Sequence, residues 1–212
     1  QQALMLLGAL ALLVVPLSLG LREPGFAQGA PKRSQTIAQA LREAFTYRSF
    51  QLLMAGYFVC GFQVVFIGVH MPSYLKDHNM SPEVASIALA LIGLFNVFGT
   101  YISGSLGQRM AKRKILAFIY FSRSVAIVLF LLAPLTPMSV YLFSSVMGFL
   151  WLSTVPLTMG LVTVMFGTRY MATLYGFVFV SHQIGSFLGV WLAGRLYDQF
   201  GSYDIVMGEC DR

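Results

Sequence analysis

Six polar or aromatic side chains lie near the centres of long apolar stretches, where polar groups are costly and are commonly functional. Amide and indole groups can hydrogen-bond a solute, and a guanidinium can bind an anion. An imidazole can donate a hydrogen bond to a carboxylate or pass on a proton near neutral pH. The sequence therefore predicts a solute pathway lined by Gln63, Asn96, Arg123, Trp151, His182 and Gln183.

Each of these residues also has a structural explanation. Small and polar stripes commonly hold membrane helices together, and this explains Asn96 at least as well as solute binding does. Gln63 and Trp151 could equally be packing residues. Arg123 could bond a backbone carbonyl or extend its charge towards the interface. Among the six, His182 is the strongest functional candidate.

The chain that carries these residues is too apolar for a water-soluble domain. Of its 212 residues, 57% are hydrophobic and 10% are charged, and the mean hydropathy is +0.73. Soluble domains carry nearer a quarter charged residues. The net charge of +6 lies mainly in turns between apolar runs, which indicates an anionic membrane surface and not a nucleic-acid partner. The sequence thus predicts an all-α integral membrane protein whose main partner is the lipid bilayer.

Six apolar stretches are each long enough to cross a bilayer, which takes about 20 residues. A linker at 21–49 follows the first stretch, and its part from Ser34 onward has the periodicity of an amphipathic helix, although an ordinary solvated helix fits as well. Residues 205–212 form only a stub of another helix, so we interpret both ends as truncations. The spans are expected at 1–20, 50–75, 84–106, 115–133, 138–166 and 172–194, with the last five forming a bundle at 50–204.

The cations are distributed unequally between alternate turns. Ten lie in the linker and in the turns at 107–114 and 167–170, whereas the opposite turns hold Lys76 and Arg195. Short loops rich in Lys and Arg stay on the cytoplasmic side. Residues 21–49 and 107–114 are therefore predicted to be cytoplasmic, in a multi-pass protein of the cell membrane.

The basic turn Gly104–Lys114 has an echo 90 residues further on, at Gly194–Gly201. Gly104 matches Gly194, and Leu106 matches Leu196. By the predicted topology the two copies lie on opposite faces of the membrane, as an inverted 3+3 repeat requires.

The same turn resembles the loop signature of the major facilitator superfamily. Gln108 takes the place of the family's acid and Ala111 that of its second glycine. The run 167–189 is most similar to the bacterial monocarboxylate/oxalate–formate antiporter-like branch. The resemblance implies that the chain holds the sixth to eleventh helices of a transporter, with an N-terminal half as its missing partner. It also implies a gating loop that comprises Gly104, Gly107, Arg109, Lys112 and Arg113.

Enzymatic chemistry is not indicated. The sequence has no H-E-x-x-H, G-x-S-x-G or P-loop pattern, Cys60 and Cys210 form no metal-binding pair, and no acid lies within a span. No cofactor or metal is expected, although a proton or ion gradient could drive transport.

We predict a secondary active transporter of a small organic solute, such as a monocarboxylate or another organic acid, working by alternating access. The alternatives are a drug or metabolite efflux permease, or a non-transporting membrane scaffold or receptor.

Overall fold

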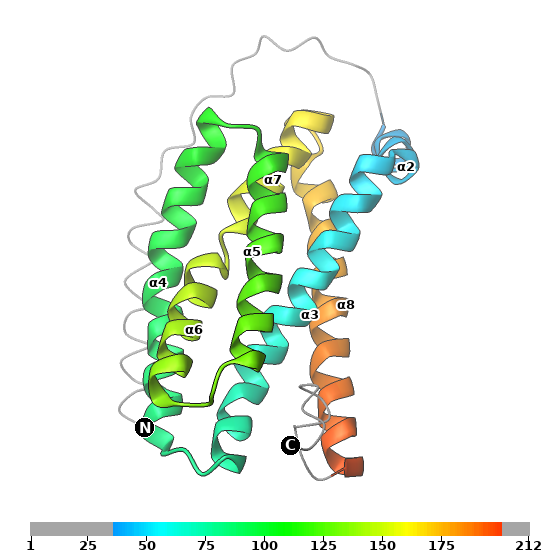
Figure 1. Ribbon diagram of the computed structural model, residues 1–212. Helices are drawn as coiled ribbons and strands as arrows, with labels where there is room; N and C mark the ends of the chain where they lie inside the picture. Colours follow the sequence, from blue (N-terminus) through cyan, green and yellow to red (C-terminus); the bar gives the residue numbers. More distant parts are fainter. Residues whose placement is uncertain (1–35, 201–212) are drawn as a thin grey trace, which may run out of the picture. The chain divides into compact units, whose positions relative to one another are not determined.

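The computed structural model describes residues 36–200, apart from the side chain of Phe200, and every regular element in this range is an α-helix (Figure 1). The predicted first span at 1–20, the linker up to residue 35 and the stub at 205–212 lie outside the described residues. The helices are α2 (Ile37–Thr46), α3 (Arg48–Asp77), α4 (Pro82–Arg109), α5 (Lys112–Leu132), α6 (Pro137–Leu150), α7 (Thr154–Phe166) and α8 (Met171–Phe200).

Five helical segments of this region are long and apolar enough to cross a membrane. They are α3, α4, α5, α8 and the combined stretch of α6 and α7. The all-helical membrane architecture expected from composition is therefore confirmed for the described part of the chain. Connections between successive spans lie alternately at the two ends of the bundle, so the α4–α5 and α7–α8 turns share one end with α2 (Figure 1).

Several helices run beyond their apolar centres. α4 continues past Leu106 to Arg109, so that only Met110 and Ala111 separate it from α5. Most of the segment predicted as a basic turn is thus helical. Charged side chains can extend from a helix end towards the membrane surface, and a helix need not stop where its apolar residues do.

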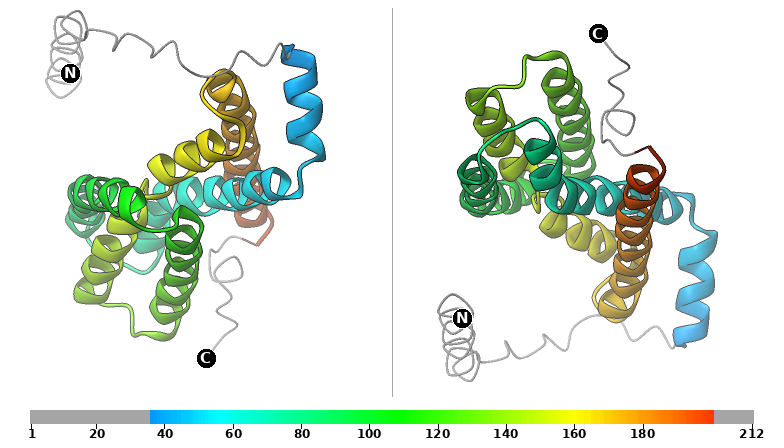
Figure 2. Two further views of the ribbon diagram at one scale, coloured as in Figure 1. Left: turned by 90° about the horizontal axis from the view of Figure 1, so that it is seen from above. Right: turned by 90° about the horizontal axis from the view of Figure 1, so that it is seen from below.

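The amphipathic segment folds as α2, which lies across the end of α3 instead of continuing it (Figure 2). Thr36 and Gln39 form a reciprocal capping box at its start, which satisfies two backbone N–H groups that would otherwise lack partners. Ala40 and Ala44 are buried, whereas Ile37 remains exposed. The buried face is therefore narrower than the apolar stripe that the sequence suggests.

Two crossing helix pairs form the centre of the bundle. α3 packs along α8, and α4 packs along α6 and α7, while α5 contacts both α6 and α7. Each crossing depends on glycine. A side chain on Gly61 of α3 would collide with the backbone of His182, and one on Gly99 of α4 would collide with the backbone of Phe149. Small residues at these points let the helix backbones approach closely, which is how membrane helices gain packing energy.

The fifth predicted span, which contains Pro156, is interrupted. The interruption comprises Trp151, Leu152 and Ser153, between α6 and α7. Proline lacks the N–H that would bond the carbonyl four residues earlier, and its ring clashes with that carbonyl. The carbonyl concerned is that of Leu152, so the helix is disturbed before the proline and not at it.

Candidate functional site

Interrupting a helix within a membrane leaves backbone groups that water cannot reach, and the protein must supply their partners. At the α6–α7 interruption these partners come from α4, from α5 and from the interruption itself. Asn96 of α4 accepts a hydrogen bond from the N–H of Leu152 at 3.0 Å. Ser153, at the end of the interruption, donates through its hydroxyl to the carbonyl of Phe149 at 2.6 Å. Side chains of the protein thus hold the interruption in place.

Arg123 of α5 provides the remaining donors at this interruption. Its Nη2 donates to the carbonyl oxygens of Leu150 and Trp151. These carbonyls lie at the C-terminal end of α6, where carbonyls lack intrahelical partners and the helix dipole is negative. The side chain of Arg123 is completely buried. Its charge is therefore placed where a cation is most favourable inside this bundle.

Cys60 of α3 joins the interruption to the other helix pair. Its Sγ accepts a hydrogen bond from Nη1 of Arg123 at 3.0 Å. The same sulfur lies 3.6 Å from Oγ1 of Thr154, the first residue of α7. It also interacts with the side chain of His182, whose backbone lies directly against the adjoining Gly61. One thiol consequently contacts polar groups from α5, α7 and α8.

His182 of α8 lies within a cluster of aromatic and hydroxyl groups. Its ring centroid is 4.9 Å from that of Tyr57 and 5.7 Å from that of Phe179, with which it is stacked. Its Nδ1 is 3.2 Å from Oε1 of Gln183 and 3.4 Å from Oγ of Ser186. This ring is half-buried, and Gln183 is exposed. The imidazole can therefore be reached from the side on which Gln183 lies.

Tyr57 extends this cluster along the α3–α8 crossing. Its hydroxyl is 3.1 Å from the hydroxyl of Tyr175, and either group can be the donor. Such a pair leaves one hydroxyl hydrogen available for a further acceptor. The arrangement of imidazole, phenols, amide and hydroxyl can hydrogen-bond a small polar solute without any metal or cofactor. Within residues 36–200 no three potential metal ligands come together.

The six predicted pathway residues fall into separate groups. Arg123, Asn96 and Trp151 meet at the α6–α7 interruption, and Cys60 connects them to His182 with Gln183. The indole of Trp151 also covers Gly68 of α3. Whether any of the six contacts a solute stays a prediction.

Gln63 lies apart from these groups. It faces a cavity of about 290 Å³ between α3, α5, α6 and α8, whose other lining residues are apolar apart from one glycine and include Phe66, Leu131 and Leu192. Its Oε1 is buried and has no hydrogen-bond partner among the described residues.

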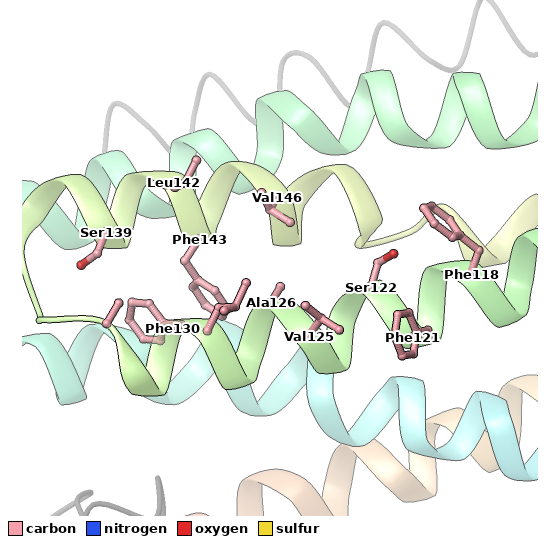
Figure 3. A pocket seen from close by; sticks show the side chains of 12 residues that line it. Phe118, Phe121, Ser122, Val125, Ala126, Phe130, Ser139, Leu142, Phe143 and Val146 are labelled. Carbon is pink, nitrogen blue, oxygen red and sulfur yellow. The ribbon is translucent and has the colours of Figure 1, made fainter.

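A second cavity, of about 360 Å³, lies between α5 and α6 and is lined by apolar side chains and two serines (Figure 3). Phe118 and Phe121 at its rim are well exposed, as is expected of a face in contact with lipid.

The predicted gating residues lie on two helix ends. Gly104 and Gly107 are within the last turns of α4, and Arg109 is its last residue, whereas Lys112 and Arg113 begin α5. The aliphatic part of the Lys112 side chain packs against Gly160 of α7. A Cβ atom on that glycine would lie 2.6 Å from Cε of Lys112. Arg109 and Arg113 are exposed. Their participation in gating stays a prediction.

Sequence reasoning missed the residues that connect the groups, namely Cys60, Thr154 and Tyr57. In the sequence Cys60 has no partner for a metal site, and a lone thiol in an apolar run carries no signal beyond packing. Tyr57, Cys60 and Gly61 all lie on α3. Their spacing does not suggest a common site unless the position of α8 beside them is known.

Comparison with known proteins agrees with this architecture. The model of the Major Facilitator Superfamily matches residues 1–190. A protein from Bacillus subtilis (strain 168) named "Uncharacterized MFS-type transporter YcxA" is 24% identical, over 94% of this chain and 50% of its own length. An "Uncharacterized protein" from Archaeoglobus fulgidus is 28% identical over 53% of this chain and 52% of its own length.

The chain therefore spans about half the length of the curated relatives it matches. No solved structure matches it.

Proposed function

Because the chain belongs to the major facilitator superfamily, a family of membrane transporters and not of enzymes, we propose that it forms the C-terminal half of a secondary active transporter. The complete protein would move a small organic solute by alternating access, with a second, N-terminal half closing the pathway. The observation that carries this proposal is the polar cluster around His182, linked through Cys60 to an interrupted helix in the centre of the bundle. Interrupted helices beside polar groups are typical of solute sites in transporters.

Two features support an inverted 3+3 repeat. Such a repeat would relate α3 to the α6–α7 stretch and α4 to α8, so the α3–α8 pair should have a counterpart in an α4–α6 pair. Both pairs are in contact. The two copies of the repeated motif also end α4 and α8, at opposite ends of the bundle (Figure 1).

The orientation in the membrane follows from charge. Within the described residues, Arg109, Lys112, Arg113 and Lys114 lie at the same end as α2 and the α7–α8 turn with Arg169, while Lys76 and Arg195 lie towards the other end. Since short cationic loops stay inside, we assign the end with α2 to the cytoplasm and the protein to the cell membrane. At that surface Gly104, Gly107, Arg109, Lys112 and Arg113 would form the gating loop.

For the solute, a monocarboxylate or another small organic acid is the class that fits best. His182, Gln183 and the Tyr57–Tyr175 pair can donate hydrogen bonds to a carboxylate, and the imidazole can also carry a proton. Arg123 could add positive potential from behind Cys60. Resemblance to the monocarboxylate/oxalate–formate branch points the same way. Efflux of a drug or metabolite is the second candidate, favoured by the rings of Tyr57 and Phe179 beside His182.

The test is uptake by the full-length parent protein in proteoliposomes, with lactate, formate and oxalate as labelled probes. We expect His182→Ala to abolish uptake of the transported acid, and His182→Gln to retain part of it because an amide can still hydrogen-bond. His78→Ala is the matched control, since His78 caps the end of α3 outside the bundle centre. Wild-type uptake by a correctly inserted His182→Ala protein would remove His182 from the pathway. Failure of all three probes combined with export of an apolar cation would favour efflux.

A further inference from the structure

Arg123 has a buried charge for which the surrounding helices offer no carboxylate. The acids in the described region are Glu43, Asp77, Glu83 and Asp198, and all lie near helix ends or in α2. Arg123 is instead completely buried in the middle of α5. Placing a guanidinium within a membrane is costly, so the contacts that offset this cost identify its role.

These contacts hold three elements together. Nη2 binds the carbonyls of Leu150 and Trp151 at the end of α6, and Nη1 donates to Sγ of Cys60 on α3. The α6 carbonyls are available only because the helix is interrupted there. If α6 and α7 formed one continuous helix, the carbonyls of Leu150 and Trp151 would bond backbone N–H groups of α7. The Arg123 contacts therefore favour the interrupted form.

The guanidinium geometry suits this task. Its donors project in fixed directions from a planar group, so they can bridge two carbonyls and a sulfur at once. A lysine ammonium lacks this planar fork. The Nε of Arg123 has no hydrogen-bond partner among the described residues, which shows that the side chain is placed for its two terminal nitrogens.

We propose that Arg123 is a positioning residue that fastens the α6–α7 interruption to Cys60 of α3, and through Cys60 to His182, whose backbone lies directly against the adjoining Gly61. A change in the bend between α6 and α7 then alters the contacts of Cys60, and a change at His182 reaches the interruption by the same route. The use that a transporter would make of this coupling rests on the proposed function. The coupling itself concerns the chain's own contacts and can be measured without any solute.

The experiment is hydrogen exchange followed by mass spectrometry on the full-length protein in lipid nanodiscs. The variants are Arg123→Met, Arg123→Lys and Cys60→Ala. Ser124→Ala is the matched control, because the Ser124 hydroxyl bonds only the carbonyl of Tyr120 in its own helix. The segments compared are 148–156 at the interruption, 178–186 around His182 and 92–100 in α4.

We expect Arg123→Met to raise exchange at 148–156 at least tenfold and to raise it at 178–186 by a smaller factor, with 92–100 changed least. Arg123→Lys should recover part of the protection, because one ammonium can still bind a carbonyl. Cys60→Ala should raise exchange around His182, and adding it to Arg123→Met should raise that exchange no further, since the two residues act in one route.

A uniform rise across all segments would mean that Arg123 only stabilises the bundle, and would overturn the proposal. Unchanged exchange at the interruption in Arg123→Met would overturn it too. Additive effects of Cys60→Ala and Arg123→Met around His182 would refute the route through Cys60. If Arg123→Met fails to fold, the same criteria apply to Arg123→Lys against Ser124→Ala.

The fluorescence emission of Trp151 gives a second readout, measured in a background where it is the sole tryptophan. This emission should shift in the Arg123 variants but not in Ser124→Ala.

Discussion

The α3–α8 crossing and the α4–α6 crossing have the same construction and different chemistry. In each pair both helices contribute a glycine at the point of closest approach, Gly61 with Gly185 in one and Gly99 with Gly148 in the other. Yet α3 and α8 are continuous and keep hydroxyl and imidazole groups between them. The α4–α6 pair instead ends at an interrupted helix. The polar side chains nearby form hydrogen bonds with the backbone of that interruption.

This difference shows how one packing arrangement can serve two purposes. At the α4–α6 crossing Asn96 is committed to the N–H of Leu152, so its oxygen is occupied by the protein itself. At the α3–α8 crossing the tyrosine hydroxyls bond one another, and His182 lies beside the exposed Gln183. Polar groups whose partners are weak or exchangeable are better suited to binding a solute than those that satisfy buried backbone.

The largest effect is expected from filling the close approach of either crossing. Gly99→Val and Gly61→Val each place a branched side chain against the backbone of the facing helix. Overpacking commonly costs about 1–3 kcal/mol, and backbone cannot move aside as a side chain can, so we expect both variants to lose the folded bundle. The measurement is the yield of monodisperse full-length protein in size-exclusion chromatography.

Two glycines serve as matched controls for that prediction. Gly93 in α4 and Gly176 in α8 have nothing within 4 Å of the position that a Cβ would take. Gly93→Ala and Gly176→Ala should leave the yield at the wild-type level or above it, because alanine is the better helix former by about 1 kcal/mol. Normal yield of Gly99→Val would contradict the close crossing.

An intermediate effect is expected at Asn96. Asn96→Leu removes the acceptor for the N–H of Leu152 and leaves that donor without its protein partner. A donor that loses its partner where water cannot reach it costs about 1–3 kcal/mol. Thermal unfolding in nanodiscs should show the loss as a lower midpoint. Asn96→Asp keeps an oxygen acceptor and should be nearer to wild type. If Asn96→Leu abolished transport without lowering the midpoint, Asn96 would belong with the solute contacts of the α3–α8 crossing, and the contrast between the crossings would fail.

The smallest effect is expected at the tyrosine pair. Tyr57→Phe or Tyr175→Phe removes one hydrogen bond, which is worth about 0.5–1.5 kcal/mol net. Because the hydroxyls bond one another, the double variant should lose little more stability than either single one. If the hydroxyls also bind solute, the single variants should raise the KM for the transported acid more than they lower the unfolding midpoint. Fully additive losses of stability would show that the hydroxyls do not depend on each other.

Much of the fold could be predicted because the signals are local. Uninterrupted apolar runs identify membrane helices, since a helix is the segment that satisfies its own backbone in lipid. α4 begins with Pro82 after the N-cap Ser81, and proline is favoured in the first turn of a helix. Pro156 lies just after the interruption of the fifth span. The interruption lies at 151–153 because proline acts on the carbonyl four residues before it.

The partners of the candidate site residues could not be predicted from sequence. Asn96 and Leu152 are 56 positions apart, and Cys60 and Arg123 are 63 apart. No periodicity within one helix specifies which residue of a distant helix will face it. Asn96 and Arg123 were identified as unusual from their polarity alone, but polarity does not distinguish a residue that binds a solute from one that satisfies an interrupted helix.

The membrane crossing, the positions of the helices and the end that carries the cations can all be predicted from the order of residues, because hydropathy and charge act residue by residue. The pairing of α3 with α8 and of α4 with α6 is visible only in the folded bundle, and so is the thiol that lies between Arg123 and His182. Those contacts depend on which small residues let which backbones approach, and that is a property of pairs of helices.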